Sequence, residues 1–581
     1  MCAARKFSEI LSEPARKVLI IPAAPRDDVQ VTFPDGRVFE GPKGATIESF
    51  VKAAYPENTP PVMACTVNHQ IRELTYHAYT DLEVEPITLA QSDGLRIYRR
   101  SLSFLLIAAA EELFPEMRIF INYGLNFGAF YFEIGYREAL TAGDLARLKA
   151  RIRELVEADL PIIKERVALE EAKAYFAQKQ WRDKLRLLES RRKDFLILYN
   201  LNGTKDYMQG YMVPSTGYLK LFDVAPYSDG YVLQYPLRTS PDVLLPPVDY
   251  PKLVYVFNEY RDWMQAVDVY DVGKLNAYHR RGRIRDLILV SEALHEQRIA
   301  QIGSLIARVR NKVRLILVSG PSSSGKTTFA KRLAIQLRTH GLRLKTVGLD
   351  DFIVDRAKTP RDEEGDYDYE SLYSLDLQLF NQVSAGLISG QEVTLPHYNF
   401  ITGRREWGEI LSAAKETIFI IEGIHGLNPE LITSIPDEQI LRIYVSALTQ
   451  LNLDHHNRVP TTDTRLLRRI VRDAAHRGYT AAETITRWPK VRRGEHKWIF
   501  PYQENADIFF NSALVYELAA LKPLAEPLLL QIEPGKPSHR EAKRLLSFLQ
   551  WLEPLANEDL VPDNSILREF IGDSILQDYT P

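Results

Sequence analysis

Short apolar runs separated by polar turns divide the C-terminal half of the chain into alternating elements. Four runs read as short buried strands, at 313–319, 344–349, 417–421 and 441–445. After the first run, residues 328–340 place Phe329, Leu333 and Leu337 on one helical face. Strands that alternate with helices predict an α/β domain with a mostly parallel sheet.

The N-terminal half shows a different pattern of hydrophobic positions. Residues 29–33 alternate as a strand does, Pro34-Asp35-Gly36 is a turn signal, and residues 37–40 predict the partner strand of a hairpin. A short helix, further strands and an amphipathic helix are expected next, at 46–54, 62–89 and 101–113. This half therefore predicts two smaller domains of mixed α and β structure.

Prolines and a long helical pattern separate the halves. Pro241, Pro246, Pro247 and Pro251 mark the boundary, and residues 283–310 predict a long helix packed on the α/β domain. Beyond that domain, Ser538-His539-Arg540-Glu541 is typical of a capping box that opens a helix. We expect an extension, two N-terminal domains, a linker with the long helix, the α/β domain and a helical segment, at residues 1–27, 28–95, 96–240, 241–310, 311–535 and 536–581.

The amino-acid composition limits the partners and sites that this chain can have. Lys plus Arg (73) nearly balance Asp plus Glu (76), so no global field attracts nucleic acid or membrane. Cys2 and Cys65 cannot build a disulfide framework or a zinc cluster. We expect a cytoplasmic homo-oligomer without a signal peptide or membrane contact. The basic runs 280–285 and 191–193, and the pair His455-His456, are interpreted as solvated surface.

The segment between the first strand and its helix carries the clearest chemistry. It reads Gly320-Pro321-Ser322-Ser323-Ser324-Gly325-Lys326-Thr327 and fits the phosphate-binding loop G-x-x-x-x-G-K-[ST]. Backbone N–H groups at the start of a helix can surround a polyphosphate, so these residues and Thr328 are assigned to ATP. Lys326 would neutralise the outer phosphates and the Thr327 hydroxyl would hold Mg²⁺. ATP and Mg²⁺ are the expected cofactors.

Charged residues follow the later strands. Asp350 and Glu422 stand at strand ends, where ligands bind in open α/β sheets, and Glu422 is the expected second Mg²⁺ contact. The helix from Thr462 then repeats arginines on one face, which predicts a lid over phosphates, with a solvated face as the alternative. These arginines are Arg465, Arg468, Arg469 and Arg472, with Arg477 just beyond.

Together these motifs resemble the uridine kinase and phosphoribulokinase family of P-loop kinases, over about residues 313–511. The resemblance rests on the P-loop, Leu349-Asp350-Asp351-Phe352, Tyr367-Asp368, Pro396-His397-Tyr398-Asn399-Phe400, Ile421-Glu422-Gly423 and residues 465–473. It implies that Asp350 is the base for the acceptor hydroxyl and that Asp368 and Tyr398 contact the acceptor. It also implies that Arg469 and Arg472 act in catalysis, with Arg469 also reaching the acceptor and Arg477 reaching ATP.

The chain departs from uridine kinases where the base is contacted. Gly403 stands in the place of the base-contacting histidine, Tyr479 replaces a lid arginine, and Arg487 replaces a glutamine. We expect transfer of the ATP γ-phosphate to a hydroxyl of a uridine- or cytidine-like nucleoside. The alternatives are another nucleoside, a sugar phosphate, or a nucleotide-dependent regulator that contacts RNA or the ribosome through its N-terminal domains.

Both N-terminal domains resemble parts of threonyl-tRNA synthetases. Residues 28–90 are similar to a TGS domain of the β-grasp type. The next domain resembles the synthetase's editing domain through Glu112-Leu113-Phe114-Pro115, residues 128–132 and Val213-Pro214-Ser215-Thr216-Gly217. The positions of its catalytic His and Cys residues hold Arg100, Phe104, Met208 and Met212. We therefore predict no deacylation of seryl-tRNA, an apolar cleft, a role as scaffold or binding module, and a kinase site that works without this domain.

Overall fold

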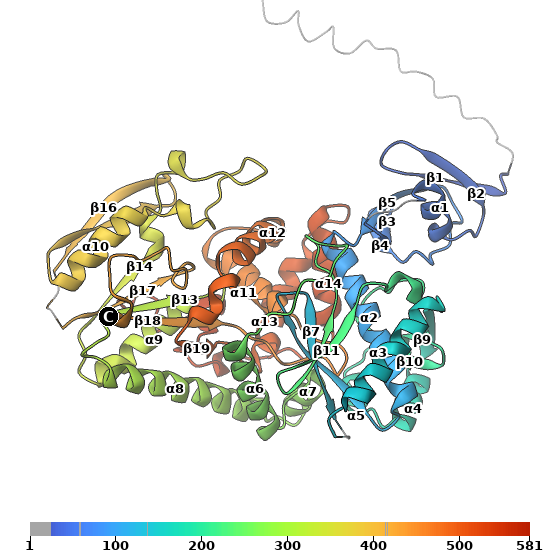
Figure 1. Cartoon of the computed structure of the whole chain (residues 1–581), viewed down its shortest axis with the longest axis horizontal. Coiled ribbons are helices and arrows are strands. Elements are labelled where there is room, and N and C mark those ends of the chain that lie inside the picture. The colour runs from blue at the N-terminus through green and yellow to red at the C-terminus, as the bar shows by residue number, and fades with distance from the viewer. Residues whose placement is uncertain (1–24, 57–59, 136–137, 413, 415, 581) are drawn as a thin grey trace, which may run out of the picture.

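The computed structural model describes residues 25–56, 60–135, 138–412, 414 and 416–580. Nearly all of the expected N-terminal extension, including Cys2, lies outside these ranges. Figure 1 shows two N-terminal domains on the right and a C-terminal α/β domain on the left, with the last helices of the chain between them. Among the described helices, none is long and apolar enough to cross a lipid bilayer.

The first N-terminal domain is a five-stranded sheet of order β2-β1-β5-β3-β4, covered by helix α1 (Ile47–Ala54). The expected hairpin is confirmed, because Asp28 pairs with Pro42 in antiparallel register. Thr46 caps α1 by accepting a hydrogen bond from the Ser49 amide. The strands are β1 (Asp28–Thr32), β2 (Val38–Pro42), β3 (Val62–Val67), β4 (Gln70–Arg72) and β5 (Leu82–Thr88).

The second N-terminal domain has two antiparallel sheets, of order β11-β12-β7-β6 and β10-β9-β8. Its main helix, α2 (Ser92–Leu113), begins nine residues before the expected start at 101, because Leu95, Ile97 and Tyr98 continue the buried face. The other helices are α3 (Ala142–Glu157), α4 (Leu169–Gln178) and α5 (Arg182–Leu188). The strands are β6 (Arg118–Leu125), β7 (Ala129–Gly135), β8 (Ile163–Ala168), β9 (Phe195–Leu201), β10 (Thr204–Asp206), β11 (Asp223–Tyr227) and β12 (Gly230–Gln234).

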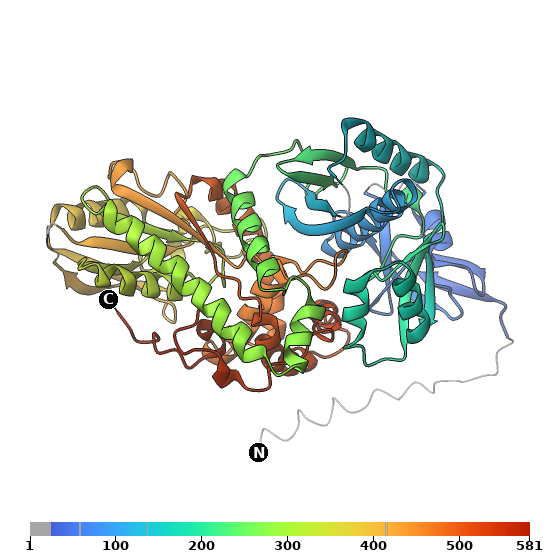
Figure 2. The same cartoon turned by 90° about the horizontal axis from the view of Figure 1, so that it is seen from below.

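Three helices join the halves: α6 (Pro251–Ala266), α7 (Val272–Arg280) and α8 (Ile284–Arg308). The long helix expected at 283–310 is confirmed as α8, which runs across the C-terminal domain in Figure 2. It packs against α9 (Lys326–Thr339) at Gly303, where an added Cβ would lie 3.2 Å from the Gln336 Cβ. A glycine here lets the two helices approach closely.

The C-terminal domain contains the expected parallel sheet, in the order β14-β17-β13-β18-β19. Its strands are β13 (Leu315–Ser319), β14 (Leu344–Gly348), β17 (Ile418–Gly423), β18 (Ile440–Ser446) and β19 (Ile508–Asn511). A hairpin of β15 (Val393–Asn399) and β16 (Arg404–Leu411) stands apart from this sheet. The remaining α-helices are α10 (Leu377–Ser389), α11 (Thr461–His476), α12 (Ala481–Trp498), α13 (Glu517–Leu530), α14 (Pro537–Leu549) and α15 (Arg568–Ile571).

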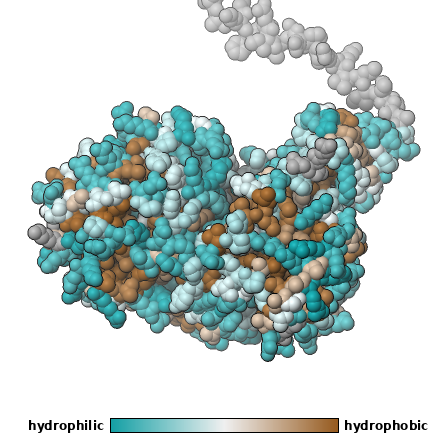
Figure 3. Space-filling view, in the orientation of Figure 1, coloured by the Kyte–Doolittle hydropathy of each residue, from teal (hydrophilic) through white to brown (hydrophobic). Residues whose placement is uncertain are grey.

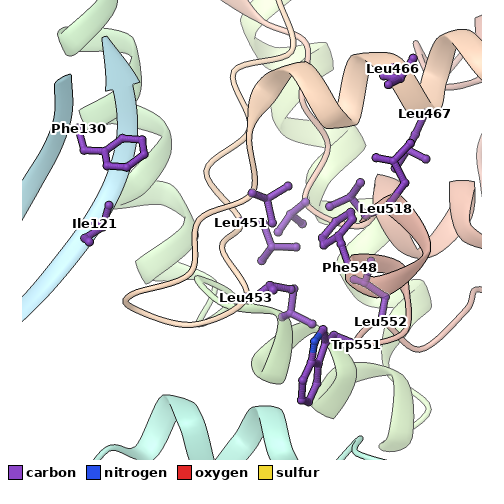
Figure 4. Close-up of a cluster of buried hydrophobic side chains, with 14 of the residues drawn as sticks. Ile121, Phe130, Leu451, Leu453, Leu466, Leu467, Leu518, Phe548, Trp551 and Leu552 are labelled. Carbon is purple, nitrogen blue, oxygen red and sulfur yellow. The ribbon is translucent and has the colours of Figure 1, made fainter. Parts of the chain in front are cut away.

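One hydrophobic core continues from the second N-terminal domain into the C-terminal domain. Figure 4 shows part of it, with Leu451 and Leu453 facing Phe548 and Trp551. The surface in Figure 3 is nevertheless notched between the C-terminal domain and the first N-terminal domain. A buried ionic cluster joins the second N-terminal domain to the C-terminal domain, because the Lys184 Nζ lies 2.8 Å from Asp206 and 3.0 Å from Asp454.

One surface interpretation, that of the histidine pair, and one capping prediction are wrong. His456 is buried and its Nδ1 lies 2.6 Å from an Asp206 oxygen, while His455 is largely covered. The basic runs are exposed as expected at Arg192, Lys193 and residues 280, 281, 283 and 285, whereas Arg191 is half-buried over the Trp551 ring. Helix α14 begins at Pro537, which suits the first helical position, so Ser538 lies inside the helix and does not cap it.

Candidate active site

The P-loop turns from the C-terminal end of β13 into the first turn of α9. Ser323 and Gly325 both take positive φ, 58° and 84°, and a Cβ on Gly320 would lie 1.9 Å from the Val445 carbonyl oxygen. Within the described part of the chain, the buried hydroxyls of Ser323 and Ser324 have no hydrogen-bond partner. A loop of this shape with free donors fits a polyphosphate at the start of a helix.

Lys326 is the first residue of α9 and is almost fully buried. Its Nζ lies 3.4 Å from the Pro321 carbonyl oxygen and 3.8 Å from a Glu422 oxygen. Because these distances are long, the N–H groups of the ammonium can still donate hydrogen bonds to phosphate oxygens. Lys326, Thr327 and Glu422 therefore gather at one edge of the sheet, and a lysine, a hydroxyl and a carboxylate are suitable groups for a magnesium-bound triphosphate.

The two strand-end carboxylates meet because their strands are neighbours. Gly348 of β14 pairs with Glu422 of β17, and Asp350 follows β14 by two residues. Crowding by protein raises the pKa of Asp350 although its residue keeps contact with solvent, and the Lys326 charge opposes this. The same desolvation raises the pKa of Glu422 to about 7, against the pull of Lys326. The Asp350 carboxylate is thus more basic than usual and lies beside the P-loop.

The arginines of α11 divide into two groups, which the expected lid did not distinguish. Arg465 and Arg468 are fully buried in ion pairs, with the nearest N–O distances 2.5 Å to Glu495 and 2.6 Å to Glu517. They hold α11 against α12 and α13. Arg465 approaches the P-loop only through a 3.4 Å contact with the Ser322 carbonyl oxygen.

The other arginines lie nearer the predicted phosphate position. The Arg469 Nη1 donates to the Ser322 hydroxyl of the P-loop at 2.7 Å. Arg472 lies 2.9 Å from Asp473, and half-exposed Arg477 lies 3.7 Å from the same carboxylate. Asp473 therefore gathers the three guanidinium groups beside the loop, since it also lies 3.2 Å from Arg469.

The acceptor side is formed by the loop around Asp368 and by the β15–β16 hairpin. Asp368 accepts a hydrogen bond from the Glu370 amide at 3.1 Å. Tyr398 is buried on β15 and packs edge-on against Phe400. Asp368 and Tyr398 therefore lie in different segments, and among the described residues no direct contact joins them.

Gly403 occupies the turn of this hairpin with φ of 68°. A Cβ at this position would lie 2.7 Å from the Arg356 guanidinium, which donates to the Tyr369 hydroxyl at 3.1 Å and to the Phe400 carbonyl oxygen at 3.1 Å. Arg356 thus fills the space that a side chain at 403 would need. The other two departures also contact each other, because Arg487 stacks over Tyr479 at 4.0 Å.

Two carboxylates near the site were not identified from the sequence. Burial and the charge of Glu495 raise the pKa of Glu370 to about 7. Glu569, in α15, accepts hydrogen bonds from the Thr328 amide at 3.1 Å and hydroxyl at 2.9 Å. Glu370 could have been found from the sequence, because it lies two residues after Asp368. Glu569 could not, because it is 241 residues from its partner Thr328 and no local pattern marks it.

An acidic trio near the acceptor loop has a structural explanation. Oxygen atoms of Asp362, Glu364 and Asp366 lie within 4.8 Å of one another. Lys490 and Arg493 of α12 pair with them, at distances such as 2.9 Å between Arg493 and Glu364. These cations neutralise the trio and tie the loop to α12.

Comparison with known families places the C-terminal domain. Residues 315–518, less than half of the chain, match the family described as Phosphoribulokinase / Uridine kinase family. This region is therefore a P-loop domain of that family, in agreement with the expectation from its motifs. The family implies ATP binding by this domain.

The N-terminal third is similar to threonyl-tRNA synthetases. It is 32% identical over 206 residues to the threonine–tRNA ligase of Bacillus velezensis, covering 35% of this chain and 32% of that protein. The corresponding match to the enzyme of Symbiobacterium thermophilum is 29% over 204 residues, covering 35% and 31%. The chain thus spans about a third of the length of these curated relatives.

Solved structures also align with part of the chain. A possible uridine kinase from Bacillus stearothermophilus is 19% identical with a TM-score of 0.26, and the alignment covers 37% of this chain and 97% of that one. D-glycerate 3-kinase from Cryptococcus neoformans is 18% identical with a TM-score of 0.20, covering 49% and 91%.

Proposed function

We propose that this protein is an ATP-dependent kinase that transfers the γ-phosphate to a hydroxyl group of a nucleoside of the uridine or cytidine type. The observation that carries the proposal is Asp350, a carboxylate of raised pKa at the strand end whose charge interacts with Lys326 of the P-loop. Phosphate transfer to an alcohol needs both a proton acceptor and a cation for the phosphate oxygens.

Each side chain has a defined task in this proposal. Asp350 takes the proton from the acceptor hydroxyl, and its raised pKa makes it a stronger base than an ordinary aspartate. Lys326 stabilises the charge on the outer phosphate oxygens, and Arg469 and Arg472 cover the loop from α11. Asp368 and Tyr398 orient the acceptor. Mg²⁺, held by Thr327 and Glu422, would supply further charge neutralisation.

The identity of the acceptor is the part of this proposal that most needs measurement. Gly403 stands where uridine kinases carry the histidine that contacts the base, and Arg356 fills the space beside it, so another nucleoside or a sugar phosphate is the main alternative acceptor. A nucleotide-dependent regulator of RNA or the ribosome is the alternative from a different class.

A screen of nucleosides and sugar phosphates would test the proposal. With the full chain, ATP and Mg²⁺, ADP release should require one acceptor class, and mass spectrometry should find that acceptor carrying one added phosphate. Lys326→Ala and excess EDTA should each abolish the product. ATP hydrolysis that no acceptor stimulates, but that RNA or ribosomes do, would favour the regulator instead.

A further inference from the structure

A second cavity lies between the two halves of the protein, with a volume of about 390 Å³. In Figure 4, Ile121 and Phe130 of the second N-terminal domain lie on one side, with Leu453 and Phe548 of the C-terminal domain on the other, and all four line the cavity. Of the four degenerate editing positions, Arg100 and Met208 also line it, whereas Phe104 and Met212 are in the surrounding core.

The cavity wall is strongly basic. Ten arginine and lysine side chains line it, against two carboxylates, Asp93 and Asp463. The expectation of an apolar cleft did not include these charges. Six of the cations come from the second N-terminal domain, and the other four, Arg458, Arg540, Lys543 and Arg544, come from the loop before α11 and from α14, which only the folded chain brings to the domain.

Some of these cations have carboxylate partners. Arg96 lies 3.0 Å from Asp93 and 2.8 Å from Glu541, and Arg544 lies 2.6 Å from Asp463. These ion pairs join α2 to α14 and α14 to α11. Both carboxylates of the wall, Asp93 and Asp463, are thus already paired with Arg96 and Arg544.

Arg99, Arg100 and Arg458 lie on this wall, each half-buried, and Asp463, the carboxylate whose charge acts on Arg99 and Arg458, is already paired with Arg544. Within the described ranges, none of the three has an ion pair, and the buried Nε of Arg458 has no hydrogen-bond partner. Arg99 and Arg458 both stack on Phe130, at 5.5 and 5.3 Å, and Arg100 donates to the Tyr211 carbonyl oxygen at 2.6 Å. Burial and neighbouring arginines lower the pKa of Arg100 to about 10, and burial with the Arg99 charge does the same for Arg458.

Such a cluster should lower the stability of the empty protein. Partly buried cations placed beside like charges have an unfavourable free energy that a bound anion would offset. Guanidinium groups bind phosphate in two-pronged geometry, and Phe130, Tyr199, Tyr207 and Tyr211 add aromatic surface to the same cavity. Its volume is in the range of small-molecule sites.

We propose that this cavity binds a nucleoside monophosphate, at a site separate from the P-loop. The phosphate contacts Arg99, Arg100 and Arg458, and the base lies against the aromatic side chains. The free nucleotide is favoured over an RNA chain because the wall closes from both halves of the protein around a volume suited to one nucleotide.

Binding should be measured on the full chain carrying Lys326→Ala, so that nucleotides bound at the P-loop contribute little. The probes for calorimetry are AMP, GMP, CMP and UMP, each with its unphosphorylated nucleoside, and a short single-stranded RNA. At least one monophosphate should bind at least about tenfold more tightly than its nucleoside, as expected for loss of a charged hydrogen-bonding partner.

Further substitutions locate the site. Arg458→Leu and Arg99→Gln should each weaken monophosphate binding at least about tenfold, and Arg281→Gln, an exposed arginine elsewhere, should leave it unchanged. The melting temperature of the ligand-free Arg458→Leu protein should hold or rise, because a partly buried charge beside like charges is removed. A purely structural arginine would lower it.

The proposal would be overturned if no monophosphate bound, if binding were insensitive to Arg99 and Arg458, or if the RNA alone bound. If Arg458→Leu fails to fold, Arg99→Gln decides the question, because it retains the loop before α11. Loss of monophosphate binding in this variant supports the site, and unchanged binding overturns it.

Discussion

Asp350 and Asp351 are adjacent in the chain but have different partners. Asp351 lies 3.0 Å from the His397 Nδ1 of the β15–β16 hairpin, whereas the charge of Asp350 interacts with Lys326 and Arg477. The charge of Asp350 is thus coupled to the P-loop lysine. Its neighbour ties the strand end to the hairpin.

The Asp350→Asn substitution tests the base. Turnover should fall by about 10²–10⁴, the usual contribution of a general base, while ATP affinity changes little because Lys326 and the loop remain. Steady-state kinetics and nucleotide titration measure the two effects. Asp351→Asn is the matched control and should retain most of the turnover. The reverse ranking would transfer the role to Asp351.

Buried His295 of α8 should make folding depend on pH. Burial and the Arg332 charge lower its pKa to about 3, and its Nε2 lies 3.2 Å from the Ala513 carbonyl oxygen. Between about pH 3 and 6.5 the unfolded chain binds a proton that the folded chain does not, so this residue makes stability rise with pH. Its contribution to the slope is at most about 1.4 kcal/mol per pH unit.

Urea denaturation from pH 4 to 7 measures this slope. His295→Gln, which keeps a donor for Ala513, should flatten it, whereas exposed His340→Gln should not. A slope unchanged by His295→Gln would mean that the histidine is protonated in the folded protein.

At the scale of elements, the short helix α15 brings a carboxylate to the start of α9. Glu569 accepts from the Thr328 amide, one of the groups assigned to ATP. A methyl group of Ile566 would lie 2.4 Å from a Cβ on Gly325, so the same segment also covers the P-loop. The C-terminal segment thus lies against the P-loop and the start of α9.

Removing the charge of Glu569 should favour ATP. Glu569→Gln is expected to lower KM for ATP about two- to fivefold, because an anion at a helix start contributes about 0.5–1 kcal/mol and repels phosphate. Initial-rate kinetics check this, with exposed Glu558→Gln as the control. An unchanged KM would show that Glu569 leaves the amide when ATP binds and has no net effect.

At the scale of the molecule, buried ionic contacts join the halves. Lys184 and Asp206 lie in the second N-terminal domain, and their partner Asp454 lies in the C-terminal domain. The expectation that the kinase site works without the N-terminal half did not take these contacts into account. The continuous core also crosses this boundary. A chain that begins near Arg283 would leave both Asp454 and apolar surface uncovered.

The Lys184→Met substitution tests how tightly the halves depend on each other. It leaves two buried carboxylates without their cation, which should lower the free energy of unfolding by about 3–5 kcal/mol. Lys173→Met, which removes an exposed pair with Glu170, should cost less than about 1 kcal/mol. Thermal or urea unfolding compares them. Equal effects of the two substitutions would support an independent C-terminal domain.

Contiguous residues determined much of this protein directly. The P-loop needs a strand, a turn with positive φ and a helix start, and all three are encoded between 313 and 340, so its place and geometry could be predicted. The parallel sheet and α8 followed in the same way from hydrophobic spacing. The stretch 465–473 predicted an arginine-bearing helix because helical spacing is local.

Other features depended on partners far along the chain. Helical spacing put Arg465, Arg468 and Arg469 on one face, but whether each meets a carboxylate or the P-loop depends on how α12 and α13 pack. His456 appeared to be surface because its partner Asp206 is 250 residues away. The basic cavity and Glu569 likewise exist only where separate segments meet. Local sequence fixes backbone conformation, whereas burial and charge pairing are properties of the packed chain, and so only the tertiary structure decided them.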